Sequence, residues 1–309
     1  PRGRYRPSAC APTGGSVTPP SPDAESPNAE MVRYWNEGAG PAWVAMQERL
    51  DVQVGPLGAA ALARAAVGAG ERVLDVGCGC GGTTLEIARA VGERGGIVAV
   101  DVSAPMLGRA QERAAAAGLA GRIEWRCEDA QVAAFAEGAF DCLYSRFGVM
   151  FFADPPAAFA NLRRGLRPGG RLAFVCWQAR ERNPWMTVPA RAAMEHVPFP
   201  PPPPPDAPGP FAFADPDRVR RILAAAGFTG IELEPLEAAM QLGGGGTEEA
   251  LELFLAVGPV GQALREAQAG PEVRARVLDA LRAAFERFRT PRGVEAPAAA
   301  WIVRAQRGG

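Results

Sequence analysis

Four residues around one glycine-rich turn have the types and the spacing to bind a nucleotide-like ligand. Asp75, Gly77, Gly79 and Gly81 lie in the segment RVLDVGCGCGGTT, which reads as an apolar strand, a turn and the start of a helix. Glycine lets a backbone turn tightly and approach a ligand without a Cβ clash. The helix that follows, expected over residues 83–91, offers unpaired N–H groups and its positive dipole end to an anionic group.

Two motif spacings overlap in this turn and indicate different cofactors. Gly77, Gly79 and Gly82 satisfy the G-x-G-x-x-G pattern of dinucleotide-binding turns. Asp75 and the glycines at 77, 79 and 81 satisfy D-x-G-x-G-x-G, and here the chain resembles the class I S-adenosylmethionine (SAM) dependent methyltransferases. An acid at the strand end repels a pyrophosphate but suits the cationic amino group of a methionine moiety. We therefore favour SAM as the cofactor.

Two further acids follow strands, where ligands of open α/β sheets bind. Asp101 ends an apolar run about twenty residues beyond the glycines and is predicted to accept the ribose hydroxyls. Asp129 follows a strand expected over residues 123–127. The resemblance implies that Asp129 receives the adenine amino group and that the Ala130 backbone donates to the ring. The alternatives are that Asp101 only begins the next helix and that Asp129 only caps a short segment at 131–135.

Three more residues are predicted to surround the cofactor. Val102 and Met106 would form apolar walls of the adenine slot, although a methionine at helical spacing is often core. Tyr34 lies in an amphipathic, aromatic stretch at 31–62, where helices preceding the sheet are expected. The resemblance implies a Tyr-Trp pair over the methionine end of SAM. The alternative is that Tyr34 and Trp35 only pack a helix onto the sheet.

The stretch at 140–152 is expected to be a strand that runs into an apolar loop, and the end of this strand should lie beside the reacting methyl group. Ser145 is predicted to contact the cofactor, and Arg146 and Phe147 to shape the acceptor pocket with Trp177. Arg146 is also a candidate catalytic residue, because an arginine at a buried strand end needs an anionic or carbonyl partner. Its alternative role is an ion pair with Asp141 or Asp154.

Cysteine and histidine usage predicts no metal site. The six cysteines show no zinc-ligand spacing and fit a reducing compartment, and Cys78 and Cys80 are interpreted as small residues of the glycine turn, with Cys78 beside the cofactor. The single histidine, His196, is a candidate general base, although an ordinary solvated histidine is the simpler reading. It lies in an insertion at 178–215, with six prolines at 200–205, that is expected to fold over the site as a lid.

Alternation of strands and helices predicts an α/β fold with a doubly wound, seven-stranded, Rossmann-like methyltransferase sheet, an N-terminal helical segment and helical cap insertions. The later elements are expected as helices at 104–117, 155–166 and 216–226, and strands at 171–177, 231–242 and 298–304. A Pro-Gly-Gly turn before the strand at 171 strengthens the family resemblance, which covers residues 31–309. A second insertion at 243–297, with helices at 247–257 and 271–288, is interpreted as a cap or a homodimer contact.

Composition narrows the class of protein. A chain of 309 residues that is 48% hydrophobic can bury a full core, and its net charge of −1 argues against a nucleic-acid partner. Residues 1–30 hold almost no large apolar groups and are predicted to be disordered. The sequence holds no run of eighteen apolar residues, so we expect no membrane span and a cytoplasmic protein. The chain begins with Pro, and Met31 is a candidate start.

The predicted function is methyl transfer from SAM to a small, partly hydrophobic acceptor at oxygen, carbon or nitrogen, by in-line displacement. The pattern resembles the ubiquinone/menaquinone-biosynthesis type of small-molecule methyltransferase. Two alternatives stay open: an NAD-dependent oxidoreductase and a non-catalytic SAM-binding protein. An apolar acceptor pocket is predicted from residues beyond the fourth and fifth strands: Phe147, Met150, Phe151, Phe152, Trp185 and Met186.

Overall fold

The computed structural model describes residues 28–308, so the predicted disordered tail lies outside the described residues except for its last three positions. The described residues begin with Asn28, and helix α1 (Ala29–Arg33) follows it directly. The described structure therefore starts three residues before Met31.

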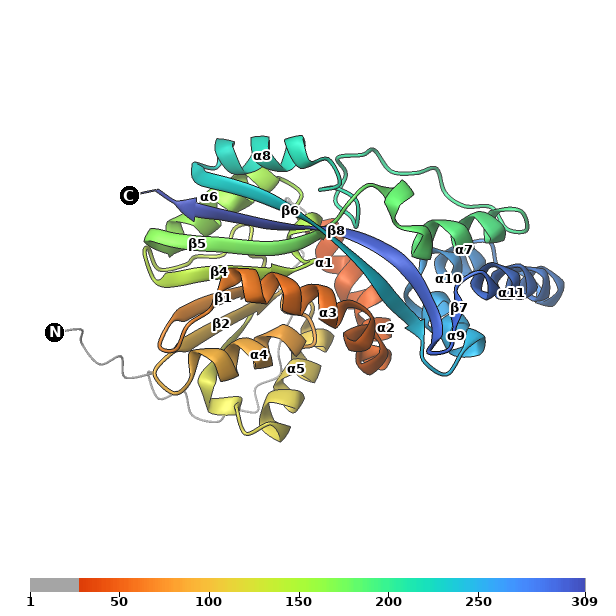
Figure 1. The fold of residues 1–309 in the computed structure, drawn as a ribbon, viewed down its shortest axis with the longest axis horizontal. Helices are drawn as coiled ribbons and strands as arrows, with labels where there is room; N and C mark the ends of the chain where they lie inside the picture. Colours follow the sequence, from red (N-terminus) through yellow and green to blue (C-terminus); the bar gives the residue numbers. More distant parts are fainter. Residues whose placement is uncertain (1–27, 309) are drawn as a thin grey trace.

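One mixed sheet organises the chain, with strands in the order β3-β2-β1-β4-β5-β8-β6 (Figure 1). The first five strands are parallel, and β8 is antiparallel to both of its neighbours. Their bounds are β1 Arg72–Val76, β2 Gly96–Asp101, β3 Ile123–Cys127, β4 Phe140–Arg146, β5 Leu166–Trp177, β6 Phe228–Gly243 and β8 Gly293–Arg307. This confirms the doubly wound α/β prediction. A two-residue strand, β7 (Arg289–Thr290), pairs with β8 and makes the sheet eight-stranded rather than seven-stranded.

Helices cover both faces of the sheet (Figure 1). Helices α3 (Gln47–Ala65), α4 (Gly82–Val91) and α5 (Ala104–Ala116) cover one face, and α6 (Pro155–Gly165) and α8 (Pro216–Ala225) cover the other. Three of them begin with a side-chain cap followed by proline: Ser103 caps α5, Asp154 caps α6 and Asp215 caps α8. Such caps satisfy N–H groups that the first helical turn leaves without partners.

A short N-terminal segment lies across the carboxyl end of the sheet. It contains α1, a π-helical turn at Tyr34–Gly38 and α2 (Ala39–Ala45). Asn36 attaches it to the loop after β2, because its Nδ2 donates to the Val102 carbonyl at 2.8 Å and its Oδ1 accepts from the Ala104 N–H at 3.0 Å. Ser103 adds a bond from its hydroxyl to the Trp35 carbonyl at 2.8 Å.

Strands β6 and β8 are longer than predicted, and they arch beyond the parallel strands towards the second insertion (Figure 1). Their pairing continues from Phe228 with Arg307 to Gly243 with Val294. The insertion contains α9 (Thr247–Val257), α10 (Pro259–Glu266) and α11 (Pro271–Glu286), of which α10 was not predicted. Helix α7 (Pro184–Met194), from the first insertion, packs against α10, α11 and β8.

One alternative is excluded and one predicted boundary was wrong. Asp129 does not cap a helix at 131–135, because its Oδ1 accepts from the Gln131 N–H at 3.0 Å and closes a turn instead. Strand β5 starts at Leu166 rather than 171, with the Pro-Gly-Gly stretch inside it and an irregularity in the pairing with β4. Of the described helices, none has both the length and the apolar character to cross a bilayer. Residues 28–308 hold no group of three metal-ligating side chains placed to share an ion.

Candidate functional site

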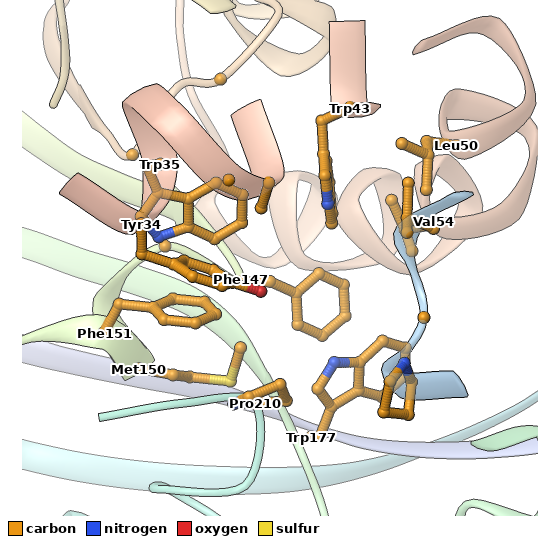
Figure 2. Close-up of a pocket in the computed structure, with 18 of the residues that line it drawn as sticks. Tyr34, Trp35, Trp43, Leu50, Val54, Phe147, Met150, Phe151, Trp177 and Pro210 are labelled. Carbon is orange, nitrogen blue, oxygen red and sulfur yellow. The ribbon is translucent and has the colours of Figure 1, made fainter. Parts of the chain in front are cut away.

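A cavity of about 900 Å³ opens at the carboxyl ends of the parallel strands. Its floor contains acids that end or follow β1, β2 and β3: Asp75, Asp101 and Asp129. Its other walls come from α2, α3, the loop after β4, α7, α9 and α10, and they are mainly apolar. Figure 2 shows Tyr34, Trp43, Phe147 and Trp177 converging on this space. The cavity thus has an acidic end and an aromatic end.

The glycine turn follows β1 and lies against backbone and side chains that leave no room for a Cβ. Gly77, Gly79 and Gly81 all have positive φ, at 67°, 56° and 77°. A Cβ on Gly77 would lie 2.8 Å from the Gly148 Cα, and one on Gly79 would lie 2.9 Å from the Met106 methyl carbon. Only glycine combines these dihedrals with such close contacts.

Asp75 lies at the end of β1, is 1% exposed and lines the cavity. Thr84, in the first turn of α4, donates its hydroxyl to Asp75 Oδ2 at 2.6 Å. Burial raises the pKa of Asp75 to about 6, against the lowering effects of the Thr84 bond and the Arg146 charge. The carboxylate is therefore costly to keep ionised in the free protein, and a cation bound beside it would offset that cost.

Asp101 ties the glycine turn to the loop after β2. Its Oδ2 accepts from the Gly79 N–H at 2.7 Å, and its Oδ1 accepts from the Ser103 N–H at 2.8 Å. Burial raises the pKa of Asp101, and these backbone bonds oppose the rise. Each carboxylate oxygen has two lone pairs, so both can still accept from a ligand hydroxyl in the cavity.

Asp129 and Asn28 contain two of the three buried polar side-chain atoms that have no hydrogen-bond partner in the described part of the chain. Asp129 Oδ1 accepts from Asn28 Nδ2 at 3.3 Å, whereas Asp129 Oδ2 and Asn28 Oδ1 have no donor. Both residues line the cavity. An unsatisfied buried polar atom costs about 1–3 kcal/mol. This end of the cavity therefore fits a ligand that brings N–H donors, as adenine does.

The remaining predicted cofactor residues divide into two groups. Cys78, Val102, Met106 and Ala130 line the cavity. Gly81 and Ser145 do not: Gly81 precedes α4 and faces Ala110, and the Ser145 hydroxyl accepts from the Gly148 N–H at 3.2 Å inside the β4 loop. Burial raises the pKa of the Cys78 thiol well above its usual value, so Cys78 lines the site as a neutral side chain.

Arg146 lines the cavity at the end of β4, and its partner is neither Asp141 nor Asp154. Its Nη2 lies 3.3 Å from Asp51 Oδ1, on helix α3. Asp51 also accepts from Arg113 Nη2 at 2.8 Å and from Gln47 Nε2 at 2.7 Å. Asp141 instead pairs with Arg167, and Asp154 caps α6. Arg146 is thus a member of a partly buried charge network that joins α3, α5 and β4.

Aromatic residues form the other end of the cavity. Tyr34 and Trp35 meet edge to face with centroids 5.3 Å apart, and Trp35 meets Phe151 at 5.1 Å. In Figure 2 the Tyr34 hydroxyl points towards Phe147 in the middle of the cavity. Phe147 stacks on Trp177, and Trp177 in turn contacts Trp185 at 5.1 Å. This continuous aromatic wall suits an apolar or planar molecule.

The structure does not bring His196 to the cavity. It lies just after α7, where its N–H donates to the Ala193 carbonyl at 3.0 Å, and it is absent from the cavity lining. Tyr34, which does line the cavity, has a pKa raised by burial and so stays a phenol at neutral pH. The placement of His196 removes its geometric support as a general base, because a base must reach the proton that it abstracts.

Sequence reasoning missed Asn28, Asp51 and Gln47 among the polar residues of the cavity. Asn28 fell inside the low-complexity tail, and a neutral side chain there carries no motif. Asp51 lies in an amphipathic helix, where a charged residue ordinarily faces solvent. The weak signal for Asn28 is its position directly before a helix, where asparagine is a preferred cap.

Comparison with known proteins gives matches to part of the chain. A family model described as a methyltransferase domain matches residues 73–170, about a third of the chain. The ubiquinone/menaquinone biosynthesis C-methyltransferase of Cellvibrio japonicus is 37% identical over 106 residues, which cover 34% of this chain and 43% of that protein. The chain thus spans less than half the length of this curated relative.

Solved structures extend the likeness of fold over most of the chain. Haemonchus contortus phosphoethanolamine N-methyltransferase 2, solved with phosphomonomethylethanolamine and S-adenosylhomocysteine, has a TM-score of 0.55 at 17% identity and covers 92% of this chain and 60% of its own. The [4+2]-cyclase SpnF has a TM-score of 0.50 at 21% identity and covers 82% of this chain and 81% of its own. Over residues 73–170 the sequence thus matches a methyltransferase domain, and the fold of the chain is similar to that of these solved structures.

Proposed function

We propose that this protein transfers a methyl group from SAM to a small, partly hydrophobic acceptor. The observation that supports this most is a single cavity with three strand-end acids at one end and an aromatic wall at the other. The acidic end has the donors and acceptors that a cationic amino acid tail, a ribose and an adenine require. The aromatic end leaves space for a second, apolar molecule.

Each acid has a separate part in holding the cofactor. Asp75 faces the cationic amino group, Asp101 accepts from the ribose hydroxyls while keeping its bonds to the glycine turn, and Asp129 accepts from the adenine amine. Val102 and Met106 pack against the base, and the glycine turn lets the backbone approach the ligand. Gly81 and Ser145 support this surface from behind without contacting it.

When bound, SAM would supply an electrophilic methyl group on a sulfonium, and SAH would be the leaving group as an acceptor atom attacks the methyl carbon in line with the C–S bond. The protein's own residues hold the acceptor close to that group and exclude water, and proximity with desolvation accounts for much of the acceleration expected. Phe147, Trp177 and Trp185 orient an apolar acceptor. Residues 178–215, which carry α7 and the cavity-lining prolines 200–203, act as a lid.

One pair of measurements tests this function. Calorimetry should detect S-adenosylhomocysteine (SAH) binding to the purified chain, and radiolabelled methyl from SAM should pass to the small-molecule fraction of an extract. Label found only in proteins or nucleic acids would contradict the acceptor class. A rise in melting temperature with NADH but not with SAH would favour the oxidoreductase alternative. SAH binding without transfer to any fraction would favour a non-catalytic SAM-binding protein.

A further inference from the structure

The orientation of the Asn28 side chain follows from its neighbour. Asn28 is 5% exposed, and its Nδ2 donates to Asp129 Oδ1 at 3.3 Å. A carboxylate can only accept, so the NH₂ group of the amide must face Asp129 and the carbonyl oxygen must face the other way. The unpartnered Asn28 Oδ1 is therefore a consequence of the contact and not of an arbitrary choice of amide rotamer.

Asn28 does not perform the local task that its position favours. It is the N-cap of α1, where an asparagine side chain ordinarily accepts from an N–H of the first turn. Here no side-chain cap bond forms, and the amide is directed to Asp129, 101 residues away in the sequence. The side chain makes a contact at the cavity in place of the cap bond, which indicates that Asn28 has a role there.

Asp129 has one occupied and one free oxygen. Its Oδ1 accepts from both Asn28 Nδ2 and the Gln131 N–H, at 3.3 and 3.0 Å. Its Oδ2 has no donor within residues 28–308. Two buried acceptors without donors thus belong to side chains that are bonded to each other and that both line the cavity, so a small ligand group with two N–H hydrogens would satisfy both.

We propose that Asn28 and Asp129 together read position 6 of the purine, each accepting one hydrogen of the exocyclic amine of adenine. This inference rests on the proposed function and names Asn28 as a specificity-determining residue of it. A 6-oxo purine presents a carbonyl oxygen at the same point, and that oxygen faces two acceptors. The pair therefore selects a 6-amino purine nucleoside and rejects its 6-oxo counterpart.

Calorimetry with two matched ligands tests the proposal without requiring any acceptor or turnover. The probes are SAH and S-inosyl-L-homocysteine, in which a carbonyl oxygen replaces the 6-amino group and N1 carries a hydrogen. The N1 difference is common to wild type and variants, so the change in preference between them reports on position 6. Wild-type protein should bind SAH about 100-fold more tightly, because the 6-oxo ligand leaves buried acceptors without donors. Asn28→Ala should weaken SAH about tenfold while leaving the 6-oxo ligand unchanged or bound more tightly.

A second variant, Asp129→Asn, should reduce or reverse the preference of the protein for SAH over the 6-oxo ligand. In Asp129→Asn the position of Oδ1 must still accept from Asn28 and Gln131, so the amide NH₂ takes the position of Oδ2. That position then donates to a carbonyl oxygen, and the preference for SAH should fall at least 100-fold or reverse in favour of the 6-oxo ligand. A merely structural Asp129 predicts equal loss for both ligands.

The control is Asn36→Ala, which loosens the same N-terminal segment through its bonds to Val102 and Ala104 but removes no cavity acceptor. It should weaken both ligands equally. Equal weakening by Asn28→Ala, or equal affinity of wild-type protein for the two ligands, overturns the inference and leaves the proposed function standing. Failure of wild-type protein to bind either ligand overturns both. Circular dichroism of each variant confirms that the fold is retained.

Discussion

The ring of Phe147 lies nearly parallel to that of Trp177, with centroids 4.2 Å apart and planes at 17°. Phe147 reaches this position with a φ of 59°, in the left-handed region that a side chain rarely adopts. Its neighbour Gly148 is in contact with Gly77 of the glycine turn. A strained residue thus connects the turn at one end of the cavity with the aromatic wall at the other, and strain of this kind concentrates at functional sites.

Two substitutions separate the strain of Phe147 from its stacking. Phe147→Ala removes the ring and keeps the unfavourable φ, whereas Phe147→Gly removes the ring and relieves the strain. We expect the free energy of unfolding of Phe147→Gly to be about 1 kcal/mol higher than that of Phe147→Ala. Both variants should be less stable than wild type. Urea unfolding followed by circular dichroism measures this. A glycine variant less stable than the alanine variant would contradict the strain.

The raised pKa of Asp75 predicts that SAH affinity depends on pH. A cationic amino group prefers the ionised carboxylate, and burial holds the pKa of Asp75 at about 6 in the free protein. Affinity should therefore reach a plateau above pH 6 and fall by up to tenfold for each pH unit below it. Calorimetric titration between pH 5 and pH 8 measures the profile.

Adenosine is the matched control for this profile, because it lacks the amino acid tail and should not share the fall caused by Asp75. Asp75→Asn should bind SAH more weakly at pH 7.5 and lose the dependence near pH 6. If Asp75→Asn keeps wild-type affinity and the same pH profile, Asp75 does not contact the cationic group.

The glycine turn predicts an order of sensitivity to alanine. On Gly77 a Cβ meets the Gly148 backbone at 2.8 Å, while on Gly79 it meets the mobile end of Met106 at 2.9 Å. Both φ values are positive, so backbone strain is similar. Gly77→Ala should therefore be the more destabilising, by about 1–3 kcal/mol relative to Gly79→Ala. Thermal unfolding of both variants measures the order, and a reversed order would contradict the close contact at Gly148.

The charge network around Asp51 predicts unequal effects for its members. Asp51→Ala leaves two partly buried cations, Arg113 and Arg146, without their shared carboxylate. Arg146→Met leaves Asp51 still paired with Arg113. We expect Asp51→Ala to cost about 2–3 kcal/mol of stability and Arg146→Met about 1 kcal/mol or less. Chemical unfolding of both single variants and of the double variant measures the coupling; equal losses would mean that Arg113 does not share the carboxylate.

Local motifs were predictable because their evidence is contiguous in the sequence. The strand, turn and helix around Asp75, the acid at 101 and the strand at 123–127 each depend on a few neighbouring residues, and the structure has these elements at or within a residue of the predicted bounds. The alternative in which Asp129 only caps a segment at 131–135 is excluded, because its side chain closes a turn, which competes locally with a helix. Helix α10 was missed in a stretch that begins with Gly258 and Pro259.

The arrangement of the cavity depends on contacts that cross long stretches of chain. Asn28 meets Asp129 across 101 residues and Arg146 meets Asp51 across 95, and no pattern in the sequence pairs them. Ser145 and His196 have residue types suited to a site. The Ser145 hydroxyl, however, bonds to the loop after β4, and His196 lies outside the cavity lining.

The sequence by itself determined the α/β class, the glycine turn and the acids that end or follow the strands, because backbone dihedrals and the spacing of apolar residues are local properties. Only the tertiary structure decided which side chains share the cavity, which carboxylates are already paired and which acceptors lack a donor. Those are properties of distance and burial, and they exist only once helices and strands that are remote in the chain pack against one another.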